Sequence, residues 1–163
     1  MKALARGERL KATDLLDESL AIARESDVGF HLLDRIYGTR VLAAPDAASA
    51  HAALEEAEEA VRGPIETCPG CRITLAVPAA IAAARAGDVE RLRVWEPAAE
   101  YLANVVMRLP AWTAGLEEVR GHRAQLEGNE DVAREHFRAA ASGFAESGQP
   151  LDEARCAALA TAA

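Results

Sequence analysis

Small and large apolar residues recur at the same offsets in two separate segments of the chain. Gly38 is followed twelve, sixteen and nineteen residues later by Ala50, Leu54 and Ala57. Gly121 is followed at the same offsets by Ala133, Phe137 and Ala140. A glycine that faces such an Ala-x3-[Leu/Phe]-x2-Ala stripe lets two antiparallel helices approach closely, and the large side chain fills the gap. The pattern therefore predicts two helical hairpins in which each glycine points at its own hairpin partner.

Helical periodicity continues through the rest of the chain and is interrupted by Gly, Pro and Asp at regular intervals. The expected units are a flanking helix at about 7–25, hairpins at about 28–62, 68–108 and 110–147, and a last helix at 150–162. Pro78 is expected to kink its helix, and Pro97 is expected to interrupt the next one so that it restarts near Ala98. Val and Ile rarely alternate with polar residues, so no strand pattern competes. The fold class predicted is all-α, with about eight antiparallel helices in one domain over residues 1–163.

The hairpin pattern is typical of tetratricopeptide (TPR) repeats, which stack in a right-handed superhelical array and present a binding surface. In the middle hairpin Ala80 takes the place of the glycine, and the spacing is about 41 residues, longer than the roughly 34 of a regular TPR. An irregular TPR-like array is therefore expected. An ordinary helical bundle is the alternative.

Charge, the length of apolar runs and the number of cysteines limit the classes of protein to which this chain can belong. The formal net charge is −8 and the pI about 5.0, which disfavours direct binding to nucleic acid. No apolar run reaches the roughly 20 residues of a membrane span, and the N-terminus does not resemble a secretory signal. Three cysteines are too few for a disulfide framework. We therefore expect a cytoplasmic protein that binds neither membrane nor nucleic acid.

Four stretches carry a family resemblance, namely Leu33–Gly38, Cys68–Cys71, Val77–Asp88 and Gly148–Cys156. They resemble the C-terminal TPR-like region of large actinobacterial regulators, which join an ATPase module to helical repeats, often beside a LuxR-type helix-turn-helix. The resemblance implies a sensor or protein-interaction arm of a signalling or transcriptional regulator. This chain has no G-x4-G-K-[S/T] loop and no recognisable DNA-reading helix, so neither ATPase nor DNA-binding activity is expected of it. It is either part of such a regulator or a free-standing relative.

In a TPR-like array the first helix of each hairpin lines the concave face, which predicts a partner-binding groove. Counting from the glycines, the groove residues expected are Arg35, Thr39 and Leu42 in one hairpin and Glu118, His122 and Gln125 in the other. The equivalent positions of the middle hairpin are apolar: Val77, Ile81 and Ala84. Such a groove would suit an amphipathic helix or an extended peptide. A small-molecule effector inside the superhelix is the alternative, and a merely solvated polar face is a third interpretation.

Cys68 and Cys71 form the one constellation that suggests chemistry. If Cys68 caps a helix that begins at Pro69, both sulfurs lie near the free N–H groups of the first turn, where thiolates are stabilised. A redox pair, half of a zinc site, or two ordinary half-buried residues would each fit. The four histidines are scattered and are expected to be exposed, and the Glu55-Glu56, Glu58-Glu59 and Glu117-Glu118 pairs are expected to be solvated. No catalytic residue, metal or cofactor is predicted, and the chain is not expected to be an enzyme.

Overall fold

The computed structural model describes residues 6–61 and 68–162, and within them every regular element is helical. The all-α prediction is therefore confirmed. The helices are α2 (Arg9–Glu25), α3 (Phe30–Ala43), α4 (Ala47–Ala60), α5 (Pro69–Ala86), α6 (Val89–Tyr101), the π-helix η1 (Leu102–Met107), α7 (Pro110–Leu126), α8 (Glu130–Glu146) and α9 (Pro150–Ala162).

Side-chain caps fix the starts of three helices. The Asp46 carboxylate accepts from the N–H of Ser49, and the Asp88 carboxylate accepts from the N–H of Arg91. Cys68 holds the same N-cap position on α5, with Pro69 as the first helical residue. At the other end of α5, Gly87 has a φ of 70°, a left-handed conformation that glycine adopts without steric cost. These local signals explain why the helix ends follow the sequence prediction closely.

The prediction of a break at Pro97 is wrong. α6 runs through Pro97 to Tyr101 and continues as η1, which ends at Arg108 in a left-handed conformation (φ 52°). The wider i→i+5 bonding of a π-helix accommodates an extra residue, so the helix continues without a loop. Leu92, Trp95 and Ala99 stay buried on one face of α6, and this tertiary burial offsets the hydrogen bond lost at Pro97.

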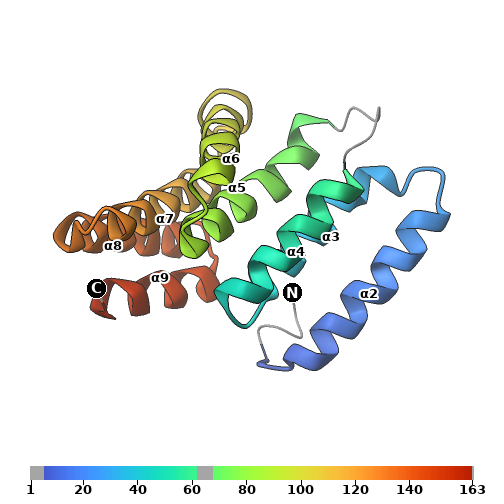
Figure 1. The fold of residues 1–163 in the computed structure, drawn as a ribbon, viewed down its shortest axis with the longest axis horizontal. Helices are drawn as coiled ribbons and strands as arrows, with labels where there is room; N and C mark the ends of the chain where they lie inside the picture. Colours follow the sequence, from blue (N-terminus) through green and yellow to red (C-terminus); the bar gives the residue numbers. More distant parts are fainter. Residues whose placement is uncertain (1–5, 62–67, 163) are drawn as a thin grey trace.

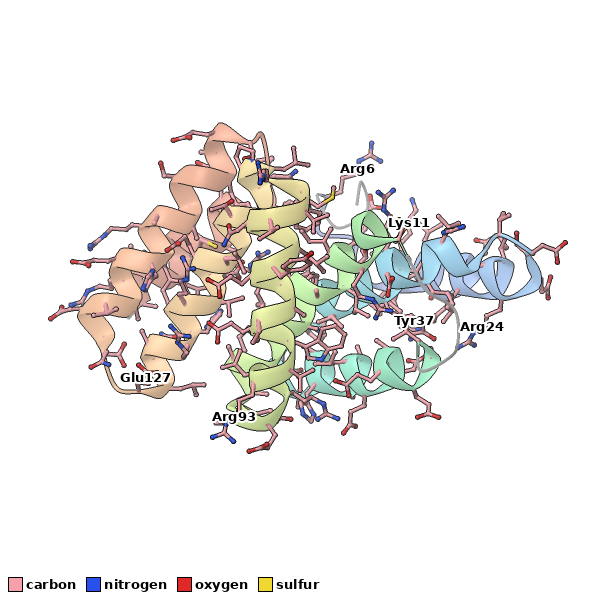
Figure 2. All side chains as sticks on the ribbon, turned by 90° about the horizontal axis from the view of Figure 1, so that it is seen from above. Arg6, Lys11, Arg24, Tyr37, Arg93 and Glu127 are labelled. Atoms are coloured by element: carbon pink, nitrogen blue, oxygen red, sulfur yellow. The ribbon has the colours of Figure 1, made fainter. Side chains whose placement is uncertain are left out.

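The helices pack pairwise around a central α5. α3 packs on α4, α5 on α6 and α7 on α8, while α5 also contacts α3, α4 and α7. In Figure 1, α2 lies at one end of the molecule and α8 and α9 at the other, with α5 between them. Figure 2 labels Arg24 of α2 and Tyr37 of α3, whose side chains join these two helices through a 2.8 Å hydrogen bond to the tyrosine hydroxyl.

The two glycines of the repeated pattern face different kinds of neighbour: one faces its own hairpin partner and the other does not. A Cβ on Gly121 would lie 2.6 Å from the Phe137 ring, so this glycine faces its hairpin partner α8 as predicted. A Cβ on Gly38 would lie 1.8 Å from the backbone oxygen of Thr74 in α5, so the prediction that Gly38 faces α4 is wrong. Pro78 has no N–H to donate to the Thr74 carbonyl. The Thr74 carbonyl oxygen therefore lacks the hydrogen bond that a residue other than proline at position 78 would donate. The Cα hydrogen of Gly38 lies against this oxygen instead.

No helix in residues 6–61 and 68–162 combines the length and the apolar character that crossing a membrane requires.

Candidate functional site

Cys68 and Cys71 meet at the N-terminus of α5. Their sulfur atoms lie 2.7 Å apart, and the backbone N–H of Cys71 donates to the Cys68 sulfur over 3.2 Å. Cys68 is exposed and Cys71 is half-buried. The pair therefore has the proximity that disulfide formation requires, and one of its sulfurs is open to an incoming reagent.

The two thiols differ in acidity. The hydrogen bond from the Cys71 side chain, followed by that from the Cys71 backbone, lowers the pKa of Cys68. The same thiol–thiol hydrogen bond, followed by burial, raises the pKa of Cys71. Because a thiolate is the nucleophile in thiol chemistry, Cys68 is the reactive member of the pair.

A buried carboxylate of α3 influences the thiols electrostatically. Asp34 of α3 is 0% exposed, and neither of its carboxylate oxygens has a hydrogen-bond partner among the described residues. It forms an ion pair with Arg72 of α5, whose Nη1 lies 3.5 Å from Oδ1. The Asp34 carboxylate slightly opposes the lowered pKa of Cys68 and adds to the raised pKa of Cys71, which places it in their electrostatic neighbourhood. Sequence reasoning missed this buried carboxylate, although Asp34 shares a helical stripe with the buried Tyr37 and Val41, which is a signal that could have found it.

The predicted groove residues of α3 remain at the surface. Arg35 is exposed, while Thr39 and Leu42 are half-buried. Arg35 forms no ion pair within the described part of the chain, and its carbonyl accepts the Thr39 hydroxyl at 2.7 Å. Leu32, one turn before Arg35, is 50% exposed. Leu32, Arg35, Thr39 and Leu42 lie along one side of α3, here called the α3 row, with an exposed leucine at one end and a leucine that partly packs against the main core at the other.

The predicted groove residues of α7 are mostly covered, which corrects the sequence interpretation. Glu118 is 0% exposed and accepts two hydrogen bonds from Arg155 of α9, at 2.7 and 2.6 Å. His122 is also buried, against the prediction of an exposed histidine, and packs edge-on to Phe137. Gln125 is half-buried, and its side-chain oxygen lies 3.2 Å from Nδ1 of His122. Helix α9 therefore closes this end of the expected groove.

Burial controls the ionisation of this cluster. Removal from water lowers the pKa of His122 to about 4, and the nearby Glu118 carboxylate opposes that shift only in part. Hydrogen bonds and charge from Glu118 raise the pKa of Arg155 despite its own burial. Burial raises the pKa of the third thiol, Cys156, which is 0% exposed, so it is chemically inert beside the other two.

The middle hairpin offers no open groove wall either. Val77, Ile81 and Ala84 are all buried in the main core, although the register predicted that they face the groove. A Cβ on Gly115 of α7 would lie 2.6 Å from a Val77 methyl group, which shows how tightly α7 covers α5. The α3 row is therefore the part of the predicted groove that stays accessible.

A polar cluster joins α4 to α6. Arg91 donates to Glu58 over 3.0 Å and to Asp88 over 2.9 Å, and Trp95 donates to the other Glu58 oxygen over 2.8 Å. His51 lies 2.9 Å from Asp88. The prediction that Glu58 is simply solvated is therefore wrong, because this carboxylate fixes α6 against α4. Every polar group named here has a partner within the cluster, which makes it a structural link.

The described residues contain no group of three or more His, Cys, Asp or Glu side chains placed to hold a metal ion. Comparison with protein families, with curated proteins and with solved structures finds no match for this chain.

Proposed function

We propose that this chain is a non-enzymatic helical-repeat interaction module. It acts as the sensor or scaffold arm of a cytoplasmic, actinobacterial signalling or transcriptional regulator. One observation carries the proposal: the first helices of three successive pairs, α3, α5 and α7, pack on one another in chain order. TPR-like arrays stack in this way, and their usual role is to present a surface to a protein or peptide.

The α3 row is the surface that such a partner would use. It offers a half-exposed leucine, a guanidinium that forms no ion pair with the described residues, and a second leucine that is half-buried against the main core. A partner helix or extended segment with a carboxylate between two apolar side chains matches that order. Arginine suits this role because its planar group binds a carboxylate through two hydrogen bonds. The partner is another protein or another domain of the same regulator.

Site-specific photo-cross-linking in the source organism tests the proposal. A photoreactive residue replaces Arg35 in the full-length protein, and a matched control replaces Arg138, which is exposed on α8 at the far end of the molecule. The proposal predicts a discrete cross-linked species, or an internal link to another domain, from position 35 and none from position 138. Equal cross-linking at both positions, or none at either, would overturn it.

A further inference from the structure

Most buried polar side chains in the described residues have hydrogen-bond partners, and the exceptions are the Asp34 carboxylate and Nε2 of His122. The Arg91 cluster and the Glu118–Arg155 pair both satisfy their charges internally. At the start of α5, in contrast, an exposed and a half-buried thiol lie 2.7 Å apart, and Arg72 on the same turn forms a 3.5 Å ion pair with the buried Asp34 carboxylate, which has no hydrogen bond among the described residues. These residues differ from those on which the proposed interaction surface rests.

The asymmetry of the two thiols fits an ordered reaction. Cys68 is exposed and receives two hydrogen bonds that favour its thiolate, whereas Cys71 lies deeper and retains its proton more firmly. An external disulfide therefore reaches Cys68 first. Cys71 lies within contact distance of the Cys68 sulfur and is already placed for a second displacement.

Asp34 provides an independent reason to assign chemistry here. A buried carboxylate that lacks hydrogen bonds is costly, and a fold that keeps one commonly does so at a reactive or strained site. The Asp34 carboxylate adds to the raised pKa of Cys71, so it helps Cys71 retain its proton, and it opposes the lowered pKa of Cys68 only slightly. Arg72 lies 3.5 Å from Asp34 and carries the compensating charge on the first turn of α5.

We propose that Cys68 and Cys71 form a redox-active dithiol site that is oxidised by disulfides of small thiols. The Cys68 thiolate attacks one sulfur of the small disulfide, forms a mixed disulfide and releases one small thiolate. Cys71 then loses its proton and attacks the Cys68 sulfur, which forms the Cys68–Cys71 disulfide and releases the second thiolate. The two departing thiolates take up the two protons from the protein thiols. The protein loses two electrons and two hydrogens, and the small disulfide is reduced to two thiols.

The test treats the reduced full chain with oxidised glutathione and follows intact mass and free thiols over time. The wild-type protein should lose two of its three thiols and end two hydrogens lighter, with no glutathione attached. Cys71→Ser should stop at the mixed disulfide, with one glutathione bound through Cys68. Cys68→Ser, which keeps a good N-cap residue, should react at least about tenfold more slowly. Cys156→Ser should behave like wild type, because that thiol is buried.

Two results would overturn the assigned roles of the cysteines. Stable glutathionylation of the wild-type protein without loss of two hydrogens would overturn the assignment of Cys71 as the resolving thiol. An unchanged rate in Cys68→Ser would overturn the assignment of Cys68 as the nucleophile. Far-UV circular dichroism of each variant shows whether it is folded. If a serine variant proves unfolded, selective alkylation of wild type settles the order: Cys68 must be labelled faster than Cys71, and equal labelling contradicts the proposal.

Discussion

Loss of the Arg155 side chain should destabilise the chain strongly. Arg155 donates to both oxygens of Glu118, at 2.7 and 2.6 Å, and the Glu118 side chain is 0% exposed. In Arg155→Met the carboxylate stays buried but loses its partner. Breaking a buried pair from one side costs about 3–5 kcal/mol. For a chain of this length each kcal/mol lowers Tm by about 2–4 °C, so the melting temperature should fall by roughly 6–20 °C.

A double variant distinguishes two causes of the lost stability: a buried Glu118 carboxylate without its partner, and the lost packing of the Arg155 side chain. Glu118→Leu combined with Arg155→Met removes both charges, and it should recover most of the loss because burying two apolar groups of similar volume is often neutral. Arg138→Met, at an exposed position on α8, should change stability by less than about 0.5 kcal/mol. Urea denaturation followed by far-UV circular dichroism gives the free energies of unfolding.

Hydrogen exchange shows which helix loses stability in Arg155→Met. Because Arg155 fastens α9 to α7, amides across Pro150–Ala162 should lose protection first in Arg155→Met. Two results would exclude an unpaired buried Glu118 carboxylate as the cause of the lost stability. One is a loss below about 1 kcal/mol for Arg155→Met, which would mean that water reaches Glu118. The other is a double variant as unstable as the single one, which would mean that the arginine acts through packing alone.

Three further predictions rest on other buried groups. Because the pKa of His122 is about 4 in the folded chain and 6.5 in the unfolded chain, only the unfolded chain takes up the proton between these values. Stability should therefore fall by roughly 3 kcal/mol as pH drops from 6.5 to 4; urea titrations across this range should show a flatter profile for His122→Gln, and identical profiles would contradict the burial argument. Gly38→Ala should lose about 1–3 kcal/mol or more through overpacking, since the new Cβ would lie 1.8 Å from the Thr74 oxygen; thermal melts decide this, because helix propensity alone predicts the opposite sign. Asp34→Asn should raise the rate of Cys68 alkylation by iodoacetamide at pH 7 slightly, by less than about twofold, because it removes a charge that opposes the lowered pKa of that thiol and is the smallest influence on it; a slower rate would refute the electrostatic role.

The helices themselves could be predicted because their limits depend on local chemistry. Asp46, Cys68 and Asp88 cap helix starts through their own side chains, and Gly87 ends α5 through its own backbone conformation. The Cys68–Cys71 contact is equally local, because a helix N-terminus brings residues three apart together. Pro97 misled the prediction because tertiary burial of α6 overrides a local helix breaker.

The candidate site was only partly predictable, because its buried charges depend on distant partners. Glu118 pairs with Arg155, which lies 37 residues further along the chain, and no local sequence pattern predicts that pair. A signal did exist: Glu118 lies in helical register with Ala114 and His122, on a buried stripe of α7. The direction of Gly38 was missed for a similar reason, since a small residue fits equally well against either neighbouring helix, and the choice of α5 over α4 is tertiary.

The affinity of the partner identified through position 35 decides whether the α3 row is a binding surface. Isothermal titration calorimetry would compare wild type, Arg35→Glu and the control Arg138→Glu, in the full chain. If the α3 row is the binding surface, Arg35→Glu should weaken binding at least about tenfold, or 1.4 kcal/mol, while Arg138→Glu leaves it unchanged. Equal affinity for all three proteins would contradict the account.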